Sequence, residues 1–208
     1  MAVDVGLGQG DAPQGRVTFE EFLSQADEDM RAEWIDGEVV MLAPASSWHQ
    51  DLCDFLTALL RLYAEATSKG YVRSAPFLMR TGTDLPAREP DVVFVSRERA
   101  DVIKESYLDG PADLVVEVVS PESRSVDRGE KFSEYEAGGV REYWMIDPQR
   151  KRAEFYQLNE EGFLEPALVG GDRTYRSRVL EGLWVKIDWF WQEPLPPLLS
   201  VLKEWGIV

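Results

Sequence analysis

A single acidic residue inside an apolar run is the feature that most constrains this chain. Residues 114–119 read Leu-Val-Val-Glu-Val-Val, and Ser120-Pro121 ends the run, since proline has no N–H to give a sheet ladder. Branched apolar residues in an unbroken run are typical of a strand buried on both faces. The acid, Glu117, therefore lies where an ionised carboxylate is costly unless it is paired, protonated or bound to a metal. We expect Glu117 to have a chemical role.

A second acid, Asp91, follows Pro90 and opens another apolar strand at residues 92–95. The chain between the two acids is long enough for a helical crossover to a parallel or adjacent strand, so Asp91 could lie beside Glu117 at one end of a cleft. Two carboxylates in an apolar setting cannot both stay ionised cheaply. A divalent cation would relieve this, and oxygen ligands favour Mg²⁺ or Mn²⁺. Such an ion can lower the pKa of a bound water and shield a phosphoryl group.

Lys131 lies on the helix that is predicted to follow the Glu117 strand, over about residues 127–137. If that helix packs back on the sheet, Lys131 could reach the metal site. Its ammonium group could then orient an attacking water or stabilise a pentacovalent phosphate. Asp127 is four residues earlier and shares the helix face, although it also suits a first-turn position as a helix cap.

Two further residues are accessory candidates. Glu33 could be a third acid that lines the cleft, or a surface acid of a hairpin. His49 is the only histidine of the chain, so no His-rich metal site can form. It could bind phosphate or act as a local base, or it could simply start a helix at the edge of the core. Cys53 lies on the apolar face of the same helix, which favours a core position.

The order of predicted elements favours a mixed fold. Thr18 and Glu21 have capping-box spacing, and Asp36-Gly37 links two apolar strands as in a tight hairpin. Helices are predicted at 18–26, 48–68, 97–104 (a charged helical turn), 127–137 and 198–205. Strands are predicted at 33–35, 38–41, 71–73, 77–79, 92–95, 142–146, 153–158, 162–164, 173–179 and 184–187, with a loop at 84–88 and the buried strand that holds Glu117. This pattern predicts an α/β or α+β fold, in which a mixed β-sheet is flanked by helices and extra antiparallel strands lie toward both ends.

Composition limits the classes of function. A chain of 208 residues suits one domain, which we place at residues 16–208 after a flexible, Gly-rich tail at residues 1–15. The net charge of −16 argues against a broad, non-specific grip on phosphate backbones, but it leaves room for a metal-mediated contact. One cysteine allows no intrachain disulfide, and no apolar run is long enough for a membrane span. The first residues also lack the pattern of a signal peptide, so we expect a cytoplasmic protein.

An ordered set of short motifs resembles a known family. The set comprises Glu33-Trp34-Ile35-Asp36-Gly37-Glu38, His49-Gln50, Ala75-Pro76-Phe77, Glu89-Pro90-Asp91, Val116-Glu117-Val118, Ser120-Pro121-Glu122-Ser123, Asp127 with Lys131, residues 135–144 (Tyr-Glu-Ala-Gly-Gly-Val-Arg-Glu-Tyr-Trp) and Ile146-Asp147-Pro148. Over residues 17–190 the chain resembles the Uma-two family of endonucleases, which belongs to the PD-(D/E)XK, restriction-endonuclease-like superfamily.

The resemblance implies a restriction-endonuclease-like fold and metal-dependent phosphodiesterase chemistry. Asp91 would match the Asp of the first half-motif, and Glu117 the acid of the second. The superfamily's Lys, two positions after that acid, is absent because Val119 stands there. The family resemblance instead points to Lys131 on the next helix.

The leading hypothesis is therefore a Mg²⁺-dependent endonuclease that acts on nucleic acid, with DNA expected by analogy. Asp91 and Glu117 would hold the metal, with Lys131 as the third catalytic residue. A homodimer would suit a double-strand cut, because two sites related by a two-fold axis are needed. The main alternative is a catalytically inactive binding module on the same fold. A phosphoesterase for small molecules is a third reading, which a closed pocket would favour.

Overall fold

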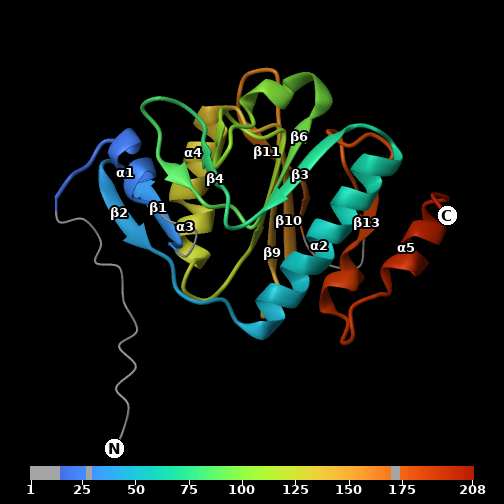
Figure 1. Ribbon diagram of the computed structural model, residues 1–208. Coiled ribbons are helices and arrows are strands. Elements are labelled where there is room, and N and C mark those ends of the chain that lie inside the picture. The colour runs from blue at the N-terminus through green and yellow to red at the C-terminus, as the bar shows by residue number, and fades with distance from the viewer. Residues whose placement is uncertain (1–14, 27–29, 170–173) are drawn as a thin grey trace, which may run out of the picture.

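The structure is a computed structural model that describes residues 15–26, 30–169 and 174–208. Its centre is a six-stranded sheet in the order β11-β10-β9-β8-β6-β3. Figure 1 shows this sheet between α4 and α2. Strands β8 and β9 are parallel and the other neighbours are antiparallel, so the sheet is mixed. The bounds are β3 Gly70–Ser74, β6 Val92–Ser96, β8 Leu114–Val118, β9 Glu142–Asp147, β10 Arg152–Leu158 and β11 Leu164–Val169.

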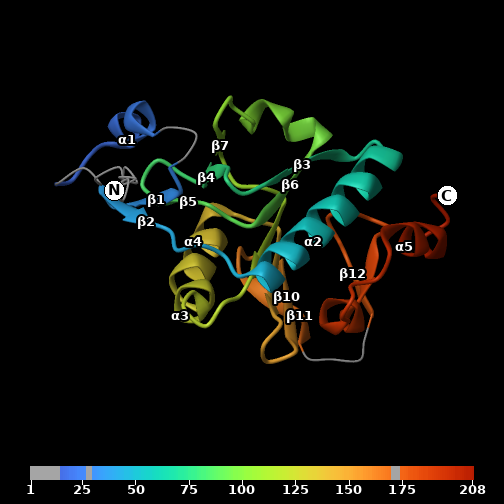
Figure 2. The same cartoon turned by 60° about the horizontal axis from the view of Figure 1, so that its bottom comes forward.

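Helices cover both faces of this sheet. Helix α2 (Ser47–Ala66) lies on one face, and α3 (Arg124–Arg128) and α4 (Glu130–Gly138) lie on the other, as Figure 2 shows. Side chains alternate along β8, so Val116 and Val118 join the α2 core while Val115 joins the α4 core. All five residues of β8 are buried, which confirms a strand covered on both faces. Glu117, between Val116 and Val118, faces the α4 side.

A second sheet, in the order β2-β1-β5-β4-β7, lies beside the first. Its strands are β1 Ala32–Ile35, β2 Glu38–Met41, β4 Leu78–Arg80, β5 Ala87–Arg88 and β7 Tyr107–Asp109. Helix α1 (Phe19–Gln25) packs on it through Phe19 and Phe22. The capping box of α1 forms as predicted, with Thr18 and Glu21 each bonded to the other's backbone N–H.

The C-terminal part extends the α2 layer. It contains β12 (Thr174–Arg176), β13 (Trp184–Lys186), the 3-10 helix η2 (Ile187–Trp191) and α5 (Leu198–Glu204). Helix α5 packs beside α2, where the rings of Tyr63 and Trp205 meet edge-on with centroids 5.3 Å apart (Figure 1). No helix among the described residues is both long enough and apolar enough to cross a membrane.

The fold confirms the predicted class, a mixed sheet flanked by helices with further antiparallel strands toward both ends. Several local predictions differ. The strand predicted at 162–164 lies later, as β11, and in the described part of 173–179 only Thr174–Arg176 is strand, as β12. The segment at 84–88 is not all loop, because Ala87–Arg88 forms β5, and β7 was not expected. The segment at 97–104 forms a shorter 3-10 helix, η1 (Arg97–Val102). The predicted tail at 1–15 lies outside the described residues except for Gly15.

The predicted helix at 127–137 is two helices, α3 and α4, which meet at Gly129. Gly129 has φ −116° and ψ −86°, outside the helical region. The carbonyl of Asp127 accepts a hydrogen bond from the Tyr143 hydroxyl (3.1 Å). An added Cβ at Gly129 would lie 2.9 Å from the carbonyl oxygen of Ser125, so a larger residue would force this corner to shift. Asp127, two residues before this corner, is buried.

The contact between α2 and the central sheet should carry much of the stability. Leu56 of α2 is fully buried in this core, whereas Leu199 of α5 is 66% exposed. Leu56→Ala should lower the free energy of unfolding by about 2–5 kcal/mol, because it removes buried methyl groups and leaves a cavity. Leu199→Ala, the matched control, should change it by less than about 0.5 kcal/mol. Urea denaturation followed by circular dichroism measures both, and equal effects would contradict this packing.

Candidate active site

A cleft of about 790 Å³ opens where the two sheets meet, bounded by the β1–β2 hairpin, the first turn of α2, the ends of β6 and β8, and helices α3 and α4. The structure brings all six sequence candidates to its wall: Glu33, His49, Asp91, Glu117, Asp127 and Lys131. They come from five stretches of chain, because Asp127 and Lys131 are only four residues apart, on α3 and α4. Ile35 and residues 40–45 add a mostly apolar part to the lining.

Asp91 and Glu117 lie on neighbouring antiparallel strands. Strands β6 and β8 pair with Val92 opposite Val116, so Asp91, just before β6, stands across from Glu117. Asp91 and Glu117 are adjacent, as expected. However, β6 and β8 are antiparallel, and the chain that connects them forms η1 and β7. The backbone N–H of Val118 donates to Asp91 Oδ2 (2.7 Å), which ties this carboxylate to the strand that holds Glu117.

Lys131 folds back onto Glu117. Its Nζ donates to Glu117 Oε1 at 3.0 Å, and the Tyr135 hydroxyl donates to the same oxygen at 2.7 Å. Lys131 and Tyr135 lie one turn apart on α4 and both are buried. Among the described residues, no group donates to the other oxygen of Glu117, Oε2. That oxygen is therefore free to meet a ligand.

Two more carboxylates complete the surroundings of the ammonium group. Lys131 Nζ is 3.5 Å from Glu33 Oε1 and 3.6 Å from Asp127 Oδ1. Asp127 Oδ2 accepts a hydrogen bond from the Ser123 hydroxyl (2.6 Å), whereas Asp127 Oδ1 is buried without a hydrogen-bond partner among the described residues. An acceptor in that state is costly to bury and would be satisfied by a cation.

Burial and charge shift the protonation equilibria of this cluster. Burial raises the pKa of Glu117 well above its ordinary value, and the nearby charges of Asp127 and Asp91 raise it further, while Lys131 opposes them. Burial likewise raises the pKa of Asp127. Burial alone would lower the pKa of Lys131, but Glu117, Glu33 and Asp127 together raise it, so the ammonium form persists. A divalent cation would favour the ionised carboxylates in the same way.

His49 lies in the first turn of α2, where its backbone N–H donates to the capping side chain of Ser46 (3.2 Å). Its Nε2 is 3.1 Å from Asp91 Oδ1. Burial lowers the pKa of His49, but the hydrogen bond and the charge of Asp91 outweigh it, so the net shift is upward. His49 thus holds the oxygen of Asp91 that Val118 leaves free.

Sequence reasoning missed several residues that hold the site together. Arg88 is 2% exposed and donates to Glu33 Oε2 (2.9 Å) and to Glu134 (2.6 Å). Arg88 falls in the predicted loop at 84–88, where no periodic signal marks a buried cation. Tyr135 gave a better signal, because it lies one helical turn after Lys131. Cys53 is buried as expected, and it also lies one turn after His49, facing Asp91.

The single histidine makes the pKa of His49 directly measurable. We expect its imidazole to titrate above about 6.5 in a ¹H NMR titration, since Asp91 favours the charged form. The ion pair between His49 and Asp91 therefore stabilises the fold at pH values below the unfolded-state pKa of His49. This contribution is lost as the pH rises through the folded-state pKa of His49. Asp91→Asn should lower the pKa, whereas Asp54→Asn, at an exposed position on the same helix, should not. A wild-type value at or below 6.5 would contradict the pairing.

The comparisons with known proteins concern the family and the fold of this chain. Residues 19–188 match the model of the Uma2 family, which is described as "Putative restriction endonuclease". The solved structure of "a putative nuclease belonging to DUF820 from Anabaena variabilis ATCC 29413" superposes with a TM-score of 0.69 at 15% sequence identity. That match covers 84% of this chain and 97% of the other. Among curated proteins, none matches this chain.

At 15% identity the structural likeness establishes the fold alone, which is restriction-endonuclease-like. The family match is broader, because it covers most of the chain and both strands that carry Asp91 and Glu117. This chain is therefore a member of the Uma2 family of restriction-endonuclease-like proteins.

Proposed function

We propose that this protein is a Mg²⁺- or Mn²⁺-dependent endonuclease, with Asp91 and Glu117 as metal ligands and Lys131 as the third catalytic residue. The observation that carries the proposal is the meeting of these three side chains in one cleft, with Lys131 Nζ 3.0 Å from Glu117. Membership of the Uma2 family and the restriction-endonuclease-like fold support nuclease chemistry.

The donor set fits a hard divalent cation. Asp91 Oδ1 and Glu117 Oε2 are carboxylate oxygens that line the cleft, and oxygen ligands are those that Mg²⁺ and Mn²⁺ prefer. The unpartnered Asp127 Oδ1 offers further negative charge nearby. When bound, such a cation supplies Lewis-acid chemistry and activates a water molecule.

The protein's own residues prepare this chemistry. Val118 N–H and His49 hold Asp91 in place, while Tyr135 holds Glu117, so both acids are oriented before any ligand arrives. Lys131 keeps its proton, and its ammonium group stabilises the extra negative charge on a phosphate oxygen in the transition state. Because α4 supplies this ammonium group, a Lys two positions after Glu117, where this chain has Val119, is not required.

The charge of the cleft explains why a cation is needed. Seven carboxylate side chains line the cleft against three arginine or lysine side chains. Of these three cations, Arg88 is paired with Glu33 and Arg31 with Glu89 (2.6 Å). These carboxylates would repel the negative charge of a phosphodiester unless a bound divalent cation neutralised part of their charge. DNA is the nucleic acid we propose, by analogy with the superfamily, and a two-fold homodimer would place one cleft on each strand.

A catalytically inactive binding module is the second candidate. It is favoured by one observation, namely that Lys131 already touches three carboxylates and neutralises part of their charge without any metal. A structural ion cluster of this kind would survive in a protein that cuts nothing. Cleavage assays with matched variants separate the two candidates.

Glu117→Gln should lower the rate of Mg²⁺- or Mn²⁺-dependent plasmid nicking by about 100-fold or more, because the neutral amide is a poor metal ligand. The matched control is Glu105→Gln, an exposed acid between η1 and β7 that does not line the cleft. Circular dichroism of each variant checks that the fold is retained. If the folded wild type nicks no plasmid with either metal, the nuclease proposal fails and the binding module is favoured.

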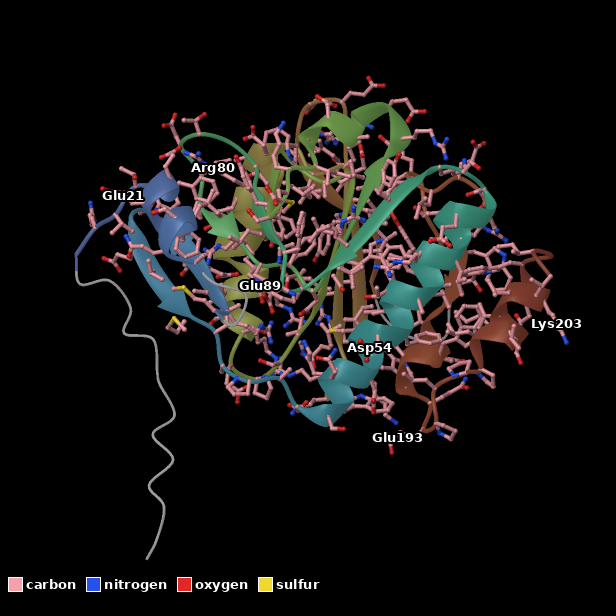
Figure 3. All side chains as sticks on the ribbon, in the orientation of Figure 1. Glu21, Asp54, Arg80, Glu89, Glu193 and Lys203 are labelled. Carbon is pink, nitrogen blue, oxygen red and sulfur yellow. The ribbon has the colours of Figure 1, made fainter. Side chains whose placement is uncertain are left out.

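Lys131→Met should also lower the nicking rate, by about 100-fold, since it removes the only cation among the described residues that contacts Glu117. It should shift the pKa of the remaining acids upward, so that residual cleavage moves to higher pH. Lys203→Met, at an exposed position on α5 that Figure 3 labels, serves as the control. Equal rates in the two lysine variants would contradict a catalytic role for Lys131.

A further inference from the structure

A second group of ligand atoms lies at the back of the same cleft, on the α2 side. His49, Cys53 and Asp91 each offer one ligand atom, and these three atoms all lie within 4.8 Å of one another. His49 and Cys53 are four residues apart on α2, so they occupy one face of the helix. Asp91 approaches that face from the end of β6.

The spacing suits a tetrahedral metal. With metal–nitrogen and metal–oxygen bonds near 2.0 Å, two ligand atoms of a tetrahedral zinc site lie about 3.3 Å apart. The distance between His49 Nε2 and Asp91 Oδ1 is 3.1 Å. A sulfur ligand has a longer bond, near 2.3 Å, so Cys53 can stand slightly further away.

The ligand types select against Mg²⁺. A thiolate and an imidazole are soft ligands, which favour Zn²⁺, Co²⁺ and similar ions, whereas Mg²⁺ requires oxygen. His49 and Asp91 line the cleft and Cys53 is buried behind them, so an ion would enter from the cleft side. Three protein ligands leave the fourth position open to water or substrate, as in catalytic rather than structural zinc sites.

We propose that His49 Nε2, Cys53 Sγ and Asp91 Oδ1 form a binding site for a thiophilic divalent cation of the Zn²⁺ type. The Cys53 thiol gives up its proton to solvent as the metal–sulfur bond forms. His49 also releases the Nε2 proton that bonds to Asp91, so that Nε2 donates its lone pair to the metal while Nδ1 carries the ring proton. No oxidant or reductant is needed. In the absence of metal, His49 Nε2 bonds to Asp91 Oδ1, and the sulfur of Cys53 lies beside them.

The site meets the proposed catalytic site at one atom. Asp91 Oδ2 is bound by Val118 N–H, so Oδ1 is the oxygen available to a cation in either site. A Zn²⁺ ion on His49 and Cys53 would therefore take from Mg²⁺ a ligand that the proposed nuclease needs. The binding itself does not depend on nuclease activity, and it is measured without nucleic acid.

The composition of the chain makes the test specific. Because Cys53 is the only cysteine, any thiolate-to-Co²⁺ charge-transfer band in the near ultraviolet arises from this residue. The full chain, freed of metal, is titrated with Co²⁺ alone and then with Zn²⁺ as a competitor. We expect one equivalent of Co²⁺ to produce the band and one equivalent of Zn²⁺ to abolish it.

Three variants support the assignment. Cys53→Ala should remove the band, and His49→Gln should weaken Co²⁺ and Zn²⁺ binding about tenfold or more. Asp54→Asn, the adjacent exposed acid on α2 in Figure 3, should change neither and is the matched control. Isothermal titration with Zn²⁺ measures the affinities, and circular dichroism identifies any variant that does not fold.

A folded wild type without the charge-transfer band would overturn the proposal, and so would equal Zn²⁺ affinity in the wild type and His49→Gln. Glu117→Gln separates this inference from the proposed function. That variant lacks the acid proposed for Mg²⁺ but keeps all three ligands, so it should retain the Co²⁺ band. Loss of the band in folded Glu117→Gln would show that Glu117 is needed to hold the cation, so that the two sites are not separate, against this proposal.

Discussion

The ion cluster around Lys131 is the interaction on which the rest of the structure depends. Its ammonium group lies 3.0 Å from Glu117, 3.5 Å from Glu33 and 3.6 Å from Asp127, and all four side chains are buried. These residues belong to the central sheet, the second sheet and the two helices that cover the junction. Removing charges from water is expensive, and losing one partner would leave another uncompensated. The cluster therefore ties three parts of the fold together at the cleft.

The same cluster links stability to chemistry. A core of apolar residues would be more stable than one that holds several carboxylates, since burial disfavours their charged forms. The cost is concentrated where the cleft opens, and the two large apolar cores on either side of β8 offset it. Asp91 and Glu117 are each held by hydrogen bonds, from Val118 and Tyr135, so they need little reorganisation when a cation arrives.

Much of the fold could be predicted because its signals are local. The apolar run around Glu117, the Asp36-Gly37 turn and the capping box at Thr18 each depend on a few neighbouring residues. The short strands β5 and β7 could not be found this way, because a strand of two or three residues is defined by its partner across the sheet. The break at Gly129 was missed for a similar reason, since the Tyr143 hydroxyl that bonds to the corner comes from β9.

The sequence by itself determined which residues are chemically unusual: an acid in a buried strand, an acid at the mouth of another, and a lysine on the next helix. Residue type and period are enough for this, because burial of a charge is costly wherever it occurs. Only the tertiary structure decided the partners. The antiparallel register of β6 and β8 sets Asp91 opposite Glu117, and the packing of α2 and α4 on opposite faces of the sheet brings Cys53 toward one acid and Lys131 to the other. Such contacts join residues distant in sequence, so no local pattern encodes their distances.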